Sequence, residues 1–293
     1  MRQLSLLDEV KKAYQEHRSA FIPGATMQAI LLALGARPED FARLQQVSAN
    51  LADDPTLPFR KSRNGRFCFD FDRARIERLE FQPFVLSVEE DFIRYDSGKV
   101  RHFRGINDDL QLNTAFQALM KFKAYVIDGV GVTPRPRLNQ KINKFVCTVF
   151  NLRTVTTPQM LGEPALEGVH SDGVDHTMTT FLGCDNMTDD SAKTFIHDMR
   201  ETSGIKFDRA RPEWILGEIQ HRHFLDTLLI VDHERKHSLS PVKAQDKRKD
   251  STRDMLIFFT RKPVEDGHVS FAYDSFKPHI EIPLSIDMVA RAS

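Results

Sequence analysis

The stretch that decides the fold class runs from residue 145 to residue 156 and reads Phe145-Val-Cys-Thr-Val-Phe-Asn-Leu-Arg-Thr-Val-Thr156. Its β-branched and aromatic residues favour a strand. Similar runs follow at residues 175–183, 194–199, 223–231 and 253–261. They are separated by Gly, Asp and Pro turns with few helices between them, a spacing typical of a sandwich or jelly roll. We therefore expect a mainly β fold with flanking helices, built on a double-stranded β-helix core of the jelly-roll or cupin-like kind.

The first half of the chain is predicted to be more helical. Apolar residues at three- and four-residue spacing predict helices at residues 4–17, 26–34 and 38–51. Further expected elements are a strand at 66–71, a hairpin at 81–106 with its turn at 96–98 and an exposed basic strand at 100–104, and a helix from Asp108 that ends before Gly129. With no internal repeat and no low-complexity linker, we predict one domain over residues 1–293. Residues 1–143 form a helical and hairpin elaboration outside a core of residues 144–293.

Composition excludes several classes of partner. The 293 residues carry 41 Lys and Arg against 41 Asp and Glu, so the formal net charge is zero, and 41% are hydrophobic, which argues against disorder. Binding to a polyanion requires a surplus of basic residues. No apolar run reaches the 18 or so residues that span a bilayer, and the N-terminus shows no signal region. We expect a soluble, cytoplasmic protein that binds neither nucleic acid nor membrane.

Histidine directs attention to one part of the chain. Seven of the eleven histidines lie between His170 and His237. The three cysteines, by contrast, are widely spaced and odd in number, so they indicate neither a disulfide framework nor a CxxC metal site. Cys68 and Cys147 stand in apolar runs and are predicted to be core residues.

The first candidate site is the pair His170 and Asp172. On an extended segment, residues two apart point to the same face, so an imidazole and a carboxylate converge. A third ligand from a neighbouring strand completes the 2-His-1-carboxylate arrangement that holds non-haem Fe(II). His237 is the best candidate, because it follows the apolar run Thr227-Leu-Leu-Ile-Val231 and precedes Pro241. In isolation, an HxD sequence is also compatible with a surface turn.

A second candidate is Arg253, at the start of the run Asp254-Met-Leu-Ile-Phe-Phe259. A guanidinium in an apolar strand is costly unless it meets a carboxylate. Its planar fork suits bidentate binding of a carboxylate. The alternative is an arginine at a strand end that reaches solvent. The ordered set of HxD, a distal histidine and this arginine is a stronger signal than any of its parts.

A third motif, His233-Glu-Arg-Lys-His237, matches the HExxH sequence of zinc peptidases. That chemistry requires a helix, whereas this segment follows a β-type run and is closed by Pro241. We therefore do not expect a peptidase. His221, His223 and Asp226 form another conceivable ligand cluster, which we interpret as a polar loop before a strand.

These motifs together resemble a known family. Residues 167–175, residues 225–232 leading to His237, the segment that begins at Arg253 and the upstream basic segment 98–104 are similar to 2-oxoglutarate/Fe(II)-dependent dioxygenases, the family that includes bacterial free L-isoleucine hydroxylases. The resemblance covers roughly residues 95–262. It implies that His170, Asp172 and His237 hold Fe(II) and that Arg253 binds the far carboxylate of 2-oxoglutarate.

The resemblance also implies a reaction. Fe(II), 2-oxoglutarate and O2 would together oxidise an unactivated C–H bond, with release of succinate and CO2. Hydroxylation, desaturation and oxidative ring closure all remain open. The expected substrate is a small molecule, a free aliphatic amino acid or a close derivative, in specialised metabolism.

The charged groups of such a substrate need charged partners, for which Glu167, Arg101 and Arg153 are candidates. Two alternatives are a peptide or protein side-chain hydroxylase of the same chemistry and a catalytically silent jelly-roll binding module. The N-terminal helices are compatible with a homodimer.

Overall fold

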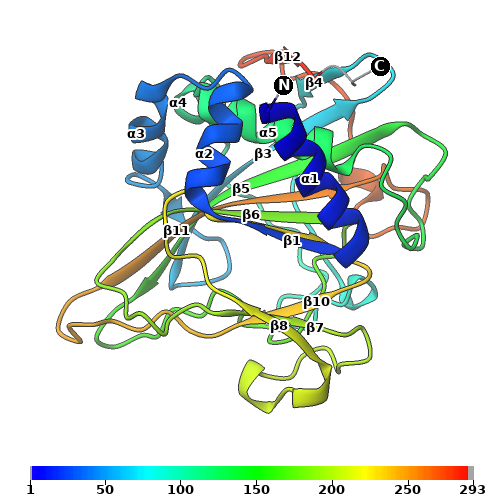
Figure 1. Ribbon diagram of the computed structural model, residues 1–293. Coiled ribbons are helices and arrows are strands. Elements are labelled where there is room, and N and C mark those ends of the chain that lie inside the picture. Colours follow the sequence, from blue (N-terminus) through cyan, green and yellow to red (C-terminus); the bar gives the residue numbers. More distant parts are fainter. Residues whose placement is uncertain (1, 290–293) are drawn as a thin grey trace.

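The computed structural model describes residues 2–289, and its core is a pair of antiparallel sheets that face each other (Figure 1). The larger sheet has the order β1-β9-β6-β11-β5-β3-β4-β12, with β2 paired to β3, and the smaller has the order β10-β7-β8. The predicted mainly β, jelly-roll fold is confirmed.

The strands of the larger sheet are β1 (Ser19–Ile22), β2 (Ala52–Asp53), β3 (Arg60–Asp70), β4 (Arg75–Arg78), β5 (Lys144–Thr156), β6 (His176–Asp185), β9 (Thr227–Val231), β11 (Ser251–Arg261) and β12 (Ser285–Asp287). Those of the smaller sheet are β7 (Thr194–His197), β8 (Ile215–Ile219) and β10 (Lys236–Leu239). The short 3-10 helices are η1 (Val88–Glu90), η2 (Phe207–Arg209), η3 (Pro212–Trp214) and η4 (Phe271–Tyr273).

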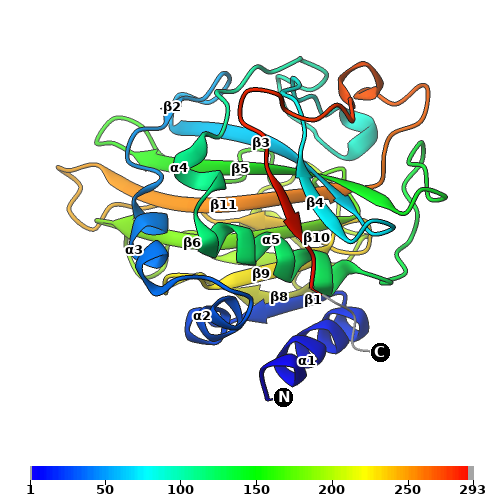
Figure 2. The same cartoon turned by 90° about the horizontal axis from the view of Figure 1, so that it is seen from above.

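Helices cover the outer face of the larger sheet (Figure 2). They are α1 (Arg2–His17), α2 (Gly24–Ala33), α3 (Pro38–Gln46), α4 (Asp108–Gln111) and α5 (Thr114–Ile127). The single helix predicted from Asp108 is in fact two, because the Asn113 side chain caps a new helix by accepting hydrogen bonds from the backbone of Ala115 and Phe116. Within residues 2–289, no helix is both long enough and apolar enough to cross a bilayer.

The central strands alternate between two environments. On one face, Met178, Leu256 and Phe258 pack with the helices in the main hydrophobic core. On the other face, Ile257 and Phe259 line a cavity that residues of the smaller sheet also border. Since successive side chains of a strand point to opposite faces, β11 contributes to the core and to the cavity at the same time.

Two predictions about the first half were wrong. Residues 81–106 form no regular hairpin: Phe84 and Arg101 make an isolated bridge, and Arg101 and Phe103 are buried instead of exposed. The core is also not confined to residues 144–293, because β1, β3 and β4 are strands of the larger sheet. Cys68 and Cys147 are buried as predicted. The assignment of one domain to the whole chain stays a prediction.

Candidate active site

The candidate metal ligands converge although they come from different segments. His170 and His237 exchange backbone hydrogen bonds of 2.9 Å in both directions, which joins the segment before β6 to β10. His170 Nε2 lies 3.4 Å from Asp172 Oδ1, and His237 Nε2 lies 3.6 Å from Asp172 Oδ2. One ligand atom from each of the three buried residues lies within 4.8 Å of the others. Such spacing suits ligands that share one transition-metal ion.

Neighbouring groups orient these side chains. His170 Nδ1 lies 2.8 Å from the Gly168 carbonyl oxygen, which leaves Nε2 facing the cluster. The Thr177 hydroxyl donates to Asp172 Oδ2 at 2.6 Å. The backbone N–H of Asp172 donates to the buried carboxylate of Asp232 at 2.7 Å. Hydrogen bonds of this kind fix the orientation of metal ligands in known sites.

Gly173 follows Asp172 for a backbone reason. Its φ is +75°, and a Cβ at this position would lie 2.6 Å from Cβ of Glu90. A side chain would therefore strain the turn and push it away from Glu90. The glycine lets the chain reverse immediately after the carboxylate ligand candidate.

The charges of the cluster favour a cation. Burial alone lowers the pKa of His170, but the charge of Glu167 and the contacts with Asp172 raise it to about 10. Burial raises the pKa of Asp172, but the two histidines, His237 foremost, bring it to about 2. Burial lowers the pKa of His237 to about 4 in spite of the nearby Asp172. The cluster therefore contains an ionised carboxylate and a neutral imidazole, and a metal ion would displace the proton held by His170.

Arg253 lies in the same cavity, on β11. It is only 3% exposed, and its Nε is buried without a hydrogen-bond partner among residues 2–289. Burial lowers the pKa of its guanidinium to about 10, so the group remains charged at neutral pH. A buried cation without an internal partner is costly, and an anionic ligand removes that cost.

Arg101 is a second buried cation on the cavity wall, 5% exposed. Its guanidinium lies 5.1 Å from the ring centre of Phe84 and 5.0 Å from that of Phe92. Its Nε and Nη2 are buried and form no hydrogen bond with the described part of the chain. The aromatic rings hold the guanidinium in place and leave these donors for a ligand.

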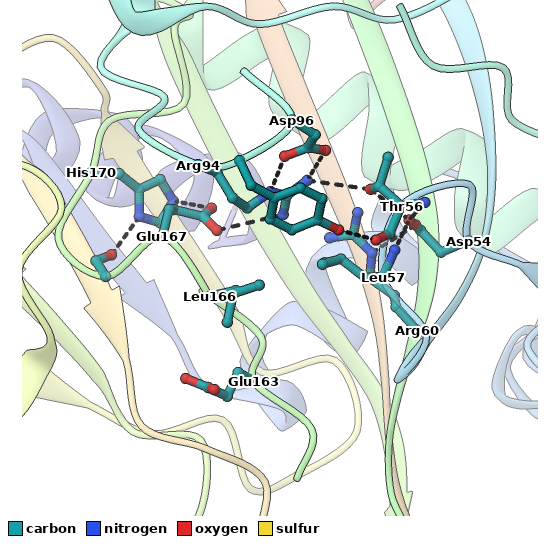
Figure 3. A network of polar contacts seen from close by, with 12 residues as sticks. Asp54, Thr56, Leu57, Arg60, Arg94, Asp96, Glu163, Leu166, Glu167 and His170 are labelled. Carbon is teal, nitrogen blue, oxygen red and sulfur yellow. Dashed lines mark hydrogen bonds and ion pairs between the residues drawn. The ribbon is translucent and has the colours of Figure 1, made fainter. Parts of the chain in front are cut away.

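Glu167 places a carboxylate beside His170, one of the candidate metal ligands (Figure 3). Its Oε1 lies 3.4 Å from His170 Nε2, and its Oε2 lies 3.7 Å from Arg94 Nη1. Arg94 is itself held by Asp96 and by the Thr56 hydroxyl, 3.3 Å from Nη2. The cavity therefore combines a cation, Arg101, with an anion, Glu167. No sequence motif marked Arg94, because it lies in an irregular segment.

The remaining wall of the cavity is largely apolar. Its apolar residues are Phe84, Leu86, Phe92, Phe103, Phe150, Leu152, Pro164, Ala165, Leu228, Ile230, Leu239, Met255, Ile257 and Phe259. A wall of this composition binds hydrocarbon groups and leaves few polar contacts to orient a ligand.

The structure excludes Arg153 from the site. Arg153 pairs across strands with Asp254, at 2.7 Å for Nε to Oδ1 and for Nη2 to Oδ2, and it does not line the cavity. Asp254 follows Arg253 on β11, so it faces the opposite side of the sheet. Arg153 thus already has its carboxylate partner on that side.

As predicted, the HExxH motif does not form a helix. His237 lies in β10, whereas His233 lies in the turn before it, with Nδ1 3.3 Å from the Thr133 carbonyl oxygen. Glu234 forms an ion pair with Arg18. These contacts connect Glu234 to the N-terminal segment and His233 to the loop after α5, and of the motif's two histidines only His237 lies at the cavity.

Asp226 is likewise structural, because its carboxylate accepts backbone hydrogen bonds from Gly24, Arg222 and His223. His221, in contrast, lines the cavity. The interpretation of residues 221–226 as a polar loop therefore describes Asp226 correctly. It does not account for His221, which lies at the cavity.

Comparison with known proteins gives consistent matches. A family profile described as 2OG-Fe dioxygenase matches residues 45–259. The chain is 50% identical over 280 residues to the "Bifunctional enzyme flvA" of Aspergillus flavus; the match covers 96% of this chain and 34% of that protein, so the chain spans about a third of its length.

Among solved structures, the Fe(II)/(alpha)ketoglutarate-dependent dioxygenase TqaL, in its selenomethionine-labelled form, is 51% identical, with 97% of each chain covered and a TM-score of 0.84. IDO from Bacillus thuringiensis shares the fold, with a TM-score of 0.65 at 16% identity over 87% of this chain and 99% of its own.

Proposed function

The chain belongs to the 2OG-Fe dioxygenase family, and from that membership we propose that it oxidises an unactivated C–H bond of a free aliphatic amino acid or a close derivative. Enzymes of this family use Fe(II), 2-oxoglutarate and O2, and this chain is a dioxygenase of that kind. The observation that carries the substrate proposal is the cavity itself. It contains Arg253 for the cosubstrate, and Arg101 and Glu167 for a second, zwitterionic molecule.

We assign the metal to His170, Asp172 and His237, whose donor atoms fit a single ion. Arg253 would pair with the distal carboxylate of 2-oxoglutarate, which gives its unpaired guanidinium an anionic partner. Iron with 2-oxoglutarate and O2 supplies an oxidant strong enough to remove hydrogen from an unactivated carbon. The protein supplies position, charge and exclusion of water.

The substrate carboxylate would bind Arg101, and its ammonium would bind Glu167. Glu167 Oε1 lies 3.4 Å from His170 Nε2. A substrate ammonium bound to the Glu167 carboxylate would therefore hold the neighbouring substrate carbons near the proposed metal site. The hydrocarbon side chain would then lie against the apolar wall, which includes Phe150, Ile257 and Phe259. The Arg94 ion pair, at 3.7 Å, would orient Glu167, whose Oε2 forms no hydrogen bond within residues 2–289.

A peptide substrate fits this arrangement less well. In a peptide, the α-amino and α-carboxyl groups are amides, so neither Arg101 nor Glu167 would meet an opposite charge. Arg101 would then stay buried without an opposite charge, which is costly, and Glu167 would keep only its contacts with Arg94 and His170. The charge pair therefore favours a free amino acid. We also propose that the chain acts in specialised metabolism.

The test begins with anaerobic titration of Fe(II) and 2-oxoglutarate into the protein. The twenty proteinogenic amino acids are then screened for O2-dependent release of succinate, with Asp172→Ala as the inactive control. We expect one or a few aliphatic amino acids to stimulate succinate release. The product mass distinguishes gain of one oxygen atom from loss of two hydrogens. Stimulation by peptides and by no free amino acid would overturn the substrate proposal.

A further inference from the structure

A hydrogen-bonded pair of polar side chains lies on the cavity wall and has no role in the site described so far. Thr179 Oγ1 is 3.2 Å from His221 Nε2, and both residues line the cavity. His221 is only 2% exposed, and its Nδ1 is buried without a partner among residues 2–289. A buried polar atom without a partner is uncommon and calls for an explanation.

The pair lies between the three candidate metal ligands and Arg253. Thr179 is two residues from Thr177 on β6, and the Thr177 hydroxyl donates to Asp172. Residues two apart on a strand share a face and lie about 7 Å apart. β6 pairs directly with β11, which carries Arg253. A dicarboxylate that reaches from the candidate metal ligands toward Arg253 would therefore pass this pair.

The imidazole of His221 is close enough to Arg253 to respond to its charge. Burial, followed by the positive charge of Arg253, lowers the pKa of His221 to about 3. The ring is therefore neutral at physiological pH. A neutral imidazole always has one N–H donor and one acceptor nitrogen. It can offer a hydrogen bond to an anion without adding a second positive charge beside Arg253.

A buried carboxylate needs more donors than one arginine provides. Its two oxygens have about four lone-pair sites, and a bidentate guanidinium uses two of them. The remaining sites must meet other donors, because an unsatisfied buried acceptor costs free energy. The Thr179 hydroxyl and the neutral His221 ring have one donor hydrogen each, and their mutual hydrogen bond uses one of them, so the pair offers one donor of the required kind.

We propose that His221, held by Thr179, is a second binding group for the distal carboxylate of 2-oxoglutarate, beside Arg253. This inference rests on the proposed role of Arg253 in the site. Arg253 supplies the charge, while the Thr179 and His221 pair fixes the orientation of the carboxylate. The pair thereby selects 2-oxo acids that carry a second carboxylate over those that lack one.

The test measures binding and does not depend on turnover. Zn(II)-loaded protein is titrated by calorimetry with 2-oxoglutarate and with 2-oxobutyrate, which has the same 2-oxo acid group and no distal carboxylate. Thr179→Val and His221→Phe should weaken binding of 2-oxoglutarate about 10- to 100-fold, the range expected for a hydrogen bond to a charged group. Binding of 2-oxobutyrate should change little.

Thr180→Val is the matched control. Thr180 is the next residue on β6, and its buried hydroxyl is 3.0 Å from that of Thr227. The substitution removes a comparable buried hydrogen bond on the opposite face, so it should leave binding of both acids unchanged. His221→Asn and His221→Gln retain a donor near Nδ1 and near Nε2 respectively. Recovery of 2-oxoglutarate binding in one of them identifies the nitrogen that donates.

The outcomes separate this inference from the proposed function. If Arg253→Met loses 2-oxoglutarate while Thr179→Val and His221→Phe bind it normally, the inference is wrong and the function stands. Equal weakening of both acids would also overturn it, because the pair would then act through the fold or the metal. If the wild-type protein does not bind 2-oxoglutarate, the proposed function itself is wrong.

Discussion

Buried cations on the two faces of the larger sheet differ in how far hydrogen bonds within the protein satisfy them. On the helix face, Lys123 of α5 is completely buried, and its ammonium donates to the carbonyl oxygens of His176 and Phe258. On the cavity face, Arg253 and Arg101 are buried with guanidinium nitrogens that have no partner within residues 2–289. Arg78, also buried on the helix face, keeps Nε and Nη1 without a partner but donates from Nη2 to the Ile106 carbonyl oxygen, whereas neither guanidinium on the cavity face forms a hydrogen bond or an ion pair within residues 2–289.

This difference agrees with the cavity face being the functional one. Burying a cation costs several kcal/mol unless hydrogen bonds or an opposite charge compensate for it. The helix face compensates for its lysine in part, through two backbone carbonyl oxygens, although burial still lowers the pKa of Lys123 to about 7. On the cavity face only a ligand can compensate for the buried charge. The ligand-free protein is therefore less stable than it could be, in favour of ligand binding. The following predictions test that contrast, from the largest expected effect to the smallest.

The largest effect is expected at the metal cluster. His237→Ala removes one of three proposed ligands, so Fe(II) binding should be lost and turnover should fall to background. His233→Ala, in the same HExxH sequence, should leave both nearly unchanged, because the His233 ring lies outside the cavity and is hydrogen-bonded to the Thr133 carbonyl oxygen. Calorimetric Fe(II) titration under anaerobic conditions and succinate release measure the two effects. Equal loss in the two variants would refute the ligand assignment.

A smaller effect, about 100-fold in affinity, is expected from removal of either unpaired arginine, since truncating one partner of a buried charge pair typically costs 2–5 kcal/mol. Arg253→Met should weaken binding of 2-oxoglutarate, and Arg101→Met should weaken binding of the amino-acid substrate. Neither variant should unfold more readily than the wild type in the absence of ligands, because each removes a buried, uncompensated charge. Chemical denaturation of the ligand-free proteins checks this. A marked loss of stability would show that the arginines are structural.

The smallest effect concerns Lys123 and appears in stability alone. Burial lowers its pKa from 10.5 to about 7. Between pH 7 and the pKa of the unfolded chain, the unfolded state binds the proton more strongly than the folded state. The free energy of unfolding therefore rises as pH increases through this window, by roughly 1 kcal/mol per pH unit.

Lys123→Met lacks this contribution, so its stability relative to the wild type should be greatest near pH 7 and should decline toward pH 10. Urea unfolding of both proteins at several pH values gives the difference. Parallel curves would show that Lys123 has a normal pKa in the folded protein. Turnover at a fixed pH should change little, because Lys123 does not line the cavity.

Sequence reasoning worked where one strand or one motif carried the signal. The long run at β5 and the runs at β6, β9 and β11 were recognisable, because β-branched and aromatic residues dominate them. It failed where the outcome depended on a neighbour. Arg153 and Arg253 both stand in apolar strands, yet Arg153 meets Asp254 on the other side of the sheet and Arg253 faces the cavity. Residue type does not tell which face of a strand is buried against which partner.

The sequence by itself determined the fold class, the chemical types available for a metal site and the order in which they occur along the chain. Those properties are local, because they depend on strand propensity and on spacing within a few residues. Only the tertiary structure decided that His237 bridges to His170, that Arg101 is buried with two nitrogens lacking a hydrogen-bond partner within residues 2–289, and that Thr179 meets His221. Each of these contacts joins segments distant in sequence, and strand pairing between such segments determines which side chains share a cavity.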